Sequence, residues 1–179
     1  MSSHRIAIIY GTTEGQTRKI SESIAQTLRH HGDRVELILG SELDPDFDPT
    51  AYEGIIVGGS LHEGHHQRYV RSLTKKHAPV LNEMPSAFFS VSLSAADESS
   101  HHEAVEAMDH FLKEAGWEVS QKEAFAGALK YTQYSWLKRF LMKKISASHG
   151  GETDTTHDFE YTDWAQVERF AEAFHARLE

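Results

Sequence analysis

The sequence predicts a doubly wound α/β fold in one domain, and three observations support this. The chain has 179 residues, a length at which a single domain can bury a sizeable core. Hydrophobic residues make up 39% and charged residues 25%, so the chain is expected to fold. Strand-like apolar runs alternate with helical patterns, as in a parallel sheet covered by helices on both faces. Without internal repeats or a linker, residues 1–179 are expected to form one domain.

The elements can be placed along the chain from their periodicity. Strands are expected at residues 6–10, 34–39, 55–57, 87–92 and 118–127. Helices are expected at residues 17 to about 31, 68–77, 102–115 and 163–178. The first strand is a continuous apolar run ending at Gly11, which is typical of a strand buried on both faces. The last helix is expected to turn an apolar stripe inward, with Trp164, Phe170 and Leu178 among its members.

Composition excludes several classes of function. The chain has no cysteine, which excludes a disulfide framework, a thiol nucleophile and thiolate metal sites. Its formal net charge of -9 disfavours a nucleic-acid partner. The N-terminal residues lead directly into a short strand-like run without a signal-peptide pattern, and no apolar run reaches the ~18 residues of a spanning helix. We expect a cytoplasmic protein that meets a membrane only at its surface.

A basic, aromatic segment interrupts the alternation before the last helix. This insertion, at about residues 130–152, is longer than ordinary connections in such folds. Residues 130–149 contain five cations and no acidic residue. The spacing favours a basic amphipathic helix that either packs on the body of the protein or contacts a membrane or an anionic substrate. The candidate contact residues are Tyr131, Trp136, Lys138, Arg139, Phe140, Lys143 and Lys144.

The loop after the first strand has the composition of a phosphate-binding loop. It offers hydroxyl groups, a glycine and the N-terminus of a helix, all of which favour an anion. It lacks both the Gly-x-Gly-x-x-Gly pattern and a Gly-Lys-Ser/Thr ending, so it matches neither the dinucleotide fingerprint nor an ATP or GTP loop. A hydroxyl-rich helix cap is the alternative interpretation. The candidate residues are Thr12, Thr13, Glu14, Gly15, Gln16 and Thr17.

This loop resembles the Thr/Ser-x-Thr-Gly-x-Thr loop of flavodoxins at Thr12, Gly15 and Thr17, and departs from it at Glu14. Almost the full chain resembles the flavodoxin-like, quinone-dependent protoporphyrinogen oxidases of bacterial heme biosynthesis, also called protoporphyrinogen IX dehydrogenases. In that family an acidic residue occupies the place of Glu14. The other matching stretches are residues 58–65, 84–91, 126–131, 150–155 and 161–164. Residues 94–102 depart from the family pattern, because they are acidic and histidine-bearing here.

The resemblance implies a flavodoxin-like sheet in the order 2-1-3-4-5 with an insertion after the fifth strand. It also implies FMN as cofactor, with its phosphate in the loop at residues 12–17. Loops after the third and fourth strands would flank the flavin ring, with His62 and Leu93 near the places where ordinary flavodoxins carry aromatic residues. The ring candidates are Ser60, Leu61, His62, Gly64, Ser92, Leu93 and Ser94. We expect no metal site, and interpret His62, His65 and His66 as loop histidines.

The implied activity is the oxidation of protoporphyrinogen IX to protoporphyrin IX, with a membrane quinone of the menaquinone type as acceptor. The flavin would carry the redox chemistry, so we assign no acid or base residue. The basic insertion would give peripheral contact with the cytoplasmic face of the inner membrane. Two alternatives stay open: a flavodoxin-type electron carrier, and a quinone reductase supplied by NAD(P)H. The sequence leaves the oligomeric state undetermined.

Overall fold

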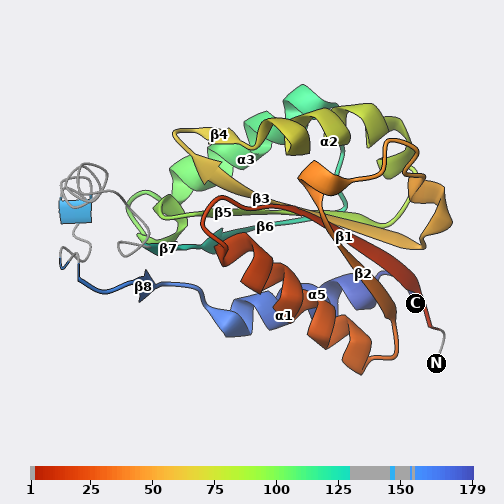
Figure 1. Cartoon of the computed structure of the whole chain (residues 1–179), viewed down its shortest axis with the longest axis horizontal. Coiled ribbons are helices and arrows are strands. Elements are labelled where there is room, and N and C mark those ends of the chain that lie inside the picture. The colour runs from red at the N-terminus through yellow and green to blue at the C-terminus, as the bar shows by residue number, and fades with distance from the viewer. Residues whose placement is uncertain (1–2, 130–145, 148–153, 155) are drawn as a thin grey trace.

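The computed structural model of the protein describes residues 3–129, 146, 147, 154 and 156–179. Its centre is a parallel sheet in the spatial order β2-β1-β3-β5-β6 (Figure 1). The strands are β1 (Arg5–Gly11), β2 (Arg34–Leu39), β3 (Gly54–His62), β5 (Ser86–Ser92) and β6 (Gln121–Ala126). When these parallel strands alone are numbered along the chain, the order is the expected 2-1-3-4-5. The predicted fold class is therefore confirmed.

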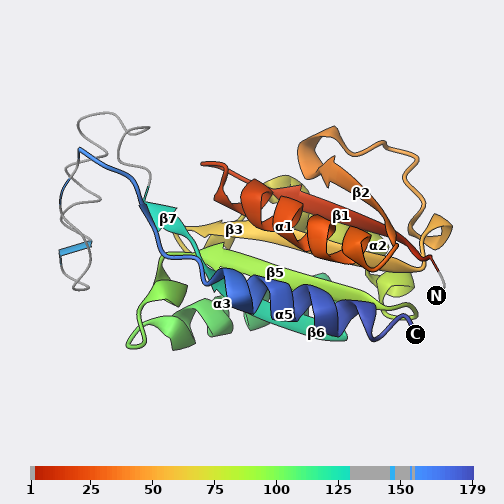
Figure 2. The same cartoon turned by 90° about the horizontal axis from the view of Figure 1, so that it is seen from below.

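Helices cover both faces of the sheet. Figure 2 shows α1 (Gln16–His30) and α5 (Trp164–His175) side by side on one face. The opposite face is covered by α2 (Arg68–Leu81) and α3 (His101–Ala115), which lie above the sheet in Figure 1. Short 3-10 turns, η1 (Gly40–Glu42), η2 (Pro49–Ala51) and η3 (Ser94–Ala96), lie in the connections. This arrangement buries the sheet between two layers of helices.

Two adjacent residues of β5 show how the core is divided. Phe89 packs with Phe125 and Phe170 on the side of α1 and α5, at ring distances of 5.6 and 6.0 Å. Phe88 points to the other side, where its ring lies 4.7 Å from that of Phe111 on α3. Successive side chains of a strand point to opposite faces of the sheet. Both phenylalanines are 0% exposed, so both faces of β5 are buried. Burial of each side chain contributes about 1.5–3 kcal/mol to the free energy of unfolding.

Two expectations about the helices are corrected. Helix α2 continues past residue 77 to Leu81, with Pro79 inside its last turn. The buried face formed by Ala78 and Leu81 continues there, so packing offsets the loss of the backbone hydrogen bond that proline cannot donate. Trp164 does not join the inward stripe of α5. It is 37% exposed, and its indole nitrogen donates to Glu160 Oε1 at 2.9 Å, since it occupies the first turn directly after the capping residue Asp163.

Strand β3 is longer than the predicted strand at residues 55–57. It continues to His62 and turns back as β4 (His65–His66), which pairs antiparallel with it. Glu63 and Gly64 form the turn with φ values of 50° and 79°, the left-handed conformation that two-residue hairpins require. The expected loop after the third strand is therefore a β-hairpin.

A small second sheet marks the base of the insertion. Strand β7 (Ala128–Leu129) pairs antiparallel with β8 (Phe159–Glu160). The basic segment therefore lies in the sequence between these two paired strands. Its candidate contact residues lie outside the residues that the structure describes: Tyr131, Trp136, Lys138, Arg139, Phe140, Lys143 and Lys144. Among the helices of the described ranges, none is both long and apolar enough to cross a lipid bilayer.

Candidate functional site

The loops singled out in the sequence meet at one edge of the sheet. Parallel pairing aligns Gly11 with Gly59, and Ser60 with Val91. The carboxyl ends of β1, β3 and β5 therefore lie together, at the left in Figure 1 and opposite to both ends of the chain. This is the edge at which ligands bind to open parallel sheets.

The loop at residues 12–17 forms a tight turn into α1. The Gly15 amide donates to Thr12 Oγ1 at 2.9 Å, and Gly15 adopts a φ of 92°. Helix α1 begins at Gln16, and the first amide groups of a helix have no acceptor within the helix. Thr17 follows in the first turn and is 1% exposed. The first amides of α1 and the Thr17 hydroxyl thus lie at the amino end of the helix, where the helix dipole is positive.

Three buried polar atoms at this edge have no hydrogen-bond partner among the described residues. They are Gln16 Oε1, Thr17 Oγ1 and Gln67 Oε1. An unsatisfied buried polar group costs about 1–3 kcal/mol, so natural proteins usually provide it with a partner. A phosphate would accept from the Thr17 hydroxyl. The residues present therefore fit the phosphate group of a flavin mononucleotide.

Gln67 is a site residue that the sequence analysis missed. Its amide nitrogen donates to Thr13 Oγ1 at 3.2 Å and also to Ser60 Oγ, so it joins the loops after β1 and β3. Thr13 Oγ1 and Ser60 Oγ lie 3.4 Å apart. A Cβ atom added to Gly11 would lie 2.6 Å from Gln67 Oε1, so the side chain of Gln67 can lie this close to β1 only because residue 11 is glycine. No motif marks Gln67, because the β3–β4 hairpin alone brings it to this position.

The stretch at residues 160–164 contacts the loop at residues 12–17 and the first turns of α1. The side-chain amide of Gln16 donates to Glu160 Oε2 at 3.1 Å and to Thr162 Oγ1 at 2.9 Å, and Lys19 Nζ lies 3.3 Å from the same carboxylate. Burial would raise the pKa of Glu160, but hydrogen bonds from Gln16, Trp164 and Lys19 outweigh it and lower the pKa. Glu160 therefore stays ionised and fixes the side chain of Gln16.

The loop after β5 lies against the base of the insertion. Ser92 Oγ accepts from the Ala95 amide at 3.2 Å, and the Ser94 carbonyl accepts from Ser100 Oγ at 2.9 Å. Leu93 is partly buried and packs in a small cluster around Leu129. On the β3 side of the edge, Leu61 is half-buried, whereas His62 and Gly64 are exposed near the hairpin turn. All the ring candidates therefore belong to one edge of the sheet.

The histidines of the hairpin do not act as one group. His62 and His65 are exposed and face each other across the hairpin. His66 is 5% exposed, with Nε2 2.8 Å from Ser90 Oγ and its ring 4.6 Å from that of Phe111. The interpretation of His66 as a loop histidine is therefore wrong. Among the described residues, the three do not form a cluster of metal ligands.

Burial controls the charge of His66. Loss of hydration, followed by the positive charges of Arg71 and His65, lowers the pKa of His66 to about 4. The imidazole is therefore neutral at neutral pH, and one ring nitrogen can share a proton with the Ser90 hydroxyl. The sequence offered no signal for this, since the buried face of β4 depends on its pairing with β3.

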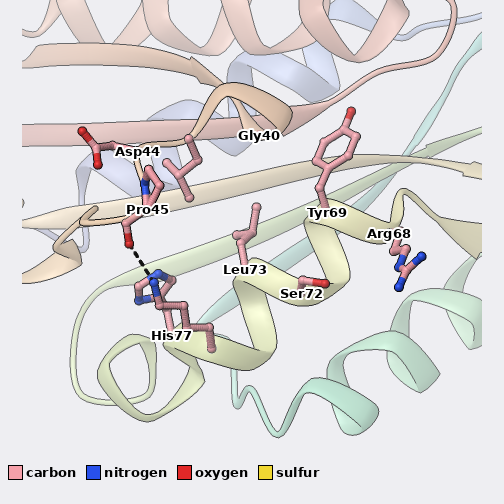
Figure 3. Close-up of a pocket in the computed structure, with 10 residues that line it drawn as sticks. Gly40, Asp44, Pro45, Arg68, Tyr69, Ser72, Leu73 and His77 are labelled. Atoms are coloured by element: carbon pink, nitrogen blue, oxygen red, sulfur yellow. Dashed lines mark hydrogen bonds between the residues drawn. The ribbon is translucent and has the colours of Figure 1, made fainter.

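A pocket of about 480 Å³ lies between α2 and the connection after β2 (Figure 3). Tyr69, Leu73 and His77 line it from the helix, and Pro45, whose carbonyl accepts from Lys76 Nζ at 2.9 Å, lines it from the other side. Desolvation lowers the pKa of His77 there. Gly40, directly after β2, and Tyr69 line this pocket, and the Thr12 backbone forms a hydrogen bond with Tyr69, so the pocket adjoins the loop after β1.

Comparison with known proteins identifies the family. The family model of the flavodoxin domain matches residues 7–156. The protoporphyrinogen IX dehydrogenase [quinone] of Escherichia coli K12 is 36% identical over 166 residues, which are 92% of this chain and 91% of the relative. The chain belongs to the flavodoxin-like protoporphyrinogen IX dehydrogenase family. The resemblance found in the sequence is thereby confirmed, and the protein is an oxidoreductase.

The family extends beyond bacteria. The protoporphyrinogen IX dehydrogenase [quinone] of Leishmania major is 35% identical over 179 residues, which are 97% of this chain and 76% of that relative. Among solved structures, a short-chain flavodoxin associated with a bacterial microcompartment superposes with a TM-score of 0.62 at 12% identity, covering 98% of this chain and 99% of that one. This likeness supports the flavodoxin fold of the family member described here.

The buried imidazole predicts a pH-dependent stability. Because the folded pKa of His66 is about 4, below the ordinary value of 6.5, the unfolded chain binds the proton more readily. The His66 contribution to the free energy of unfolding is therefore complete above pH 6.5 and is lost as the pH falls to about 4. The loss reaches about 3 kcal/mol. Urea unfolding of the wild type and His66→Gln at several pH values measures it.

Glutamine can place an amide near the position of Nε2 but does not titrate, so the variant should lose less stability over this range. Ser90→Ala is the matched control, because it removes the hydrogen-bond partner and keeps the imidazole. In this variant the free energy of unfolding should depend on pH as it does in the wild type. Equal slopes for the wild type and His66→Gln would contradict the assignment.

Proposed function

We propose that this protein oxidises protoporphyrinogen IX to protoporphyrin IX, with FMN as cofactor and a membrane quinone of the menaquinone type as acceptor. The observation that carries the proposal is the 36% identity, over nearly the whole of both chains, to a protein named for this substrate and a quinone acceptor. The Thr17 hydroxyl, which is buried in the first turn of α1 without a hydrogen-bond partner among the described residues, supports the cofactor. The reaction removes six electrons and six hydrogens from the substrate, so three quinones would be reduced to quinols.

The residues at the carboxyl edge have distinct roles in this proposal. The loop at residues 12–17 holds the FMN phosphate through backbone amides and the Thr17 hydroxyl. Gln67 keeps the loops after β1 and β3 together through Thr13 and Ser60. The loops at residues 60–64 and 92–94 flank the ring. When bound, FMN supplies the redox chemistry, and the protein orients the substrate and limits access of water.

The basic insertion is proposed to contact the substrate or the membrane. Its five cations give residues 130–149 a charge of +5 within a chain of net charge -9, so the remainder carries -14. Both porphyrin propionates and anionic lipid headgroups would be attracted to such a segment. Its base at β7 packs against Leu93, next to the proposed ring site. An insertion in this position could hold the protein at the membrane surface from which the quinone is drawn.

Anaerobic turnover tests the activity. Purified protein supplied with FMN and a soluble menaquinone analogue should convert protoporphyrinogen IX to the fluorescent porphyrin, at a rate that depends on both additions. Omission of the quinone under anaerobic conditions is the control, because it removes the acceptor. If FMN binds and fluorescence rises no faster than without protein, the activity is wrong and an electron carrier becomes the better description. Rapid bleaching of bound flavin by NADPH would instead favour a quinone reductase.

Thr17→Val tests the cofactor site. The change removes a hydroxyl that has no described partner in the protein, so the free energy of unfolding without FMN should stay the same or rise slightly. The dissociation constant for FMN should increase about tenfold or more, because a hydrogen bond to a charged group is lost. Quenching of flavin fluorescence measures the affinity. Thr27→Val, at the other end of α1, is the control and should bind FMN as the wild type does.

Flotation with anionic liposomes tests the membrane contact. Charge reversal to glutamate at four cations of the insertion should abolish flotation: Lys138, Arg139, Lys143 and Lys144. The control changes net charge equally by reversing four exposed cations elsewhere: Arg34, Lys75, Lys113 and Arg177. Flotation should depend on the position of the charges and not on their sum. Equal flotation of the wild type and the insertion variant would exclude this surface as the anchor.

A further inference from the structure

A cluster of two histidines and an aspartate lies at the amino end of the sheet, away from the proposed flavin site. His4 precedes β1, Asp33 lies between α1 and β2, and His175 is the last residue of α5. Figure 1 shows these segments at the right, near the two ends of the chain, whereas the β3–β4 hairpin and β7 lie at the left. The fold thus joins three segments that are remote in sequence.

The carboxylate of Asp33 is the centre of the cluster. Its side chain is 0% exposed. Oδ1 lies 3.1 Å from His4 Nδ1, and Oδ2 lies 2.7 Å from His175 Nδ1. The His4 backbone amide also donates to Oδ1, at 3.1 Å. The imidazoles are nearly buried, with 10% and 12% of their side chains exposed.

We propose that His4, Asp33 and His175 bind a divalent transition-metal ion, for which zinc is the best fit. Imidazole nitrogen and carboxylate oxygen are ordinary zinc ligands, at bond lengths of about 2.0–2.2 Å. Tetrahedral coordination at those lengths separates neighbouring ligand atoms by about 3.3–3.6 Å. One ligand atom from each residue lies within 4.8 Å of the others, so small rotations would bring them to that separation. Water would complete the coordination from the exposed side.

The ion would replace the hydrogen atoms that now lie between the three residues. Each Nδ1 is within hydrogen-bond distance of the carboxylate and acts as a donor in the metal-free cluster. With the ion bound, Nδ1 of both rings would bind the metal and the remaining proton would move to Nε2. A buried carboxylate and a divalent cation also reduce each other's charge, which favours binding in a partly desolvated site.

Side chains around His175 already fix the orientation of its ring. His31 stacks on it with ring centres 4.4 Å apart, and His31 Nε2 in turn lies 2.8 Å from Glu172 Oε2. His175 Nε2 is the ring nitrogen that would face away from the ion, and Glu179 Oε1 lies 3.8 Å from it. Metal-binding histidines usually direct this second nitrogen to a carboxylate or carbonyl, which orients the ring and strengthens the ligand.

The position of the site gives the ion a structural role. It would tie the start of β1, the α1–β2 connection and the end of α5 together, at the opposite end of the sheet from the loops proposed to bind FMN. Its effect should therefore appear in stability and not in turnover. The sequence analysis expected no metal site, because residues 4, 33 and 175 form no spacing that marks one.

Zinc titration of the chelator-treated full chain tests the proposal. Equilibrium dialysis should give one tightly bound ion per chain. At free zinc about 100 times the dissociation constant, the melting temperature should rise by about 5–10 °C. Magnesium at the same concentration should cause no such rise, because it prefers oxygen ligands and keeps its waters. Absence of a saturable rise with zinc would overturn the proposal.

Single variants locate the ion. His4→Asn and His175→Asn can place an amide near Nδ1, so each can keep the hydrogen bond to Asp33 while losing the metal ligand. Both should lose the zinc-dependent rise in melting temperature. His102→Asn, at an exposed position of α3, is the control and should keep it. If the cluster variants and the wild type respond alike, binding is by other histidines and the proposal is wrong.

Histidine nitrogen NMR on the wild type gives an independent test that does not depend on the variants folding. Zinc should shift two imidazoles together to the form with the metal on Nδ1 and the proton on Nε2. Changes confined to other histidines would overturn the proposal.

Discussion

The central sheet must be buried on both faces, and most of the structure follows from this constraint. Phe88 and Phe89 are adjacent on β5 and enter different cores, so neither face of the strand can be left to water. Helices must then cover both faces, and only the two ends of the sheet and its edges stay open to solvent or a ligand. Parallel pairing brings all the carboxyl ends to one of these, which is why the loops after β1, β3 and β5 meet.

The carboxyl edge is held together by side chains before any ligand binds. Gln67 links the loops after β1 and β3, while Glu160 and Thr162 hold Gln16 from the far end of the chain. These bonds restrict the loop at residues 12–17, and within the described part of the chain the buried Thr17 hydroxyl has no hydrogen-bond partner. A rigid site loses little entropy when it binds an anion, and the Thr17 hydroxyl gains a hydrogen-bond acceptor.

The two ends of the sheet differ in their chemistry. The carboxyl edge presents amides, hydroxyls and the start of α1, which favour an anion. The amino end gathers His4, Asp33 and His175, which favour a cation. An electron-transfer site and a site that fastens the ends of the chain can therefore exist in one small domain without sharing residues. The acidic surface and the basic insertion separate charge in a similar way, since the cations are concentrated in one segment.

The sequence by itself determined the alternation of strands and helices and the family, and the family resemblance implied the order of the sheet; the phosphate-binding role of residues 12–17 stays a prediction. The alternation and the resemblance depend on local periodicity and on short contiguous motifs such as residues 11–17. Only the tertiary structure decided the roles of Gln67 and His66, because the β3–β4 hairpin positions both, and the exposure of Trp164, because Glu160 holds its indole. It also brought residues 4, 33 and 175 together. Contacts between distant segments depend on how strands pair and helices pack, and no local pattern encodes them.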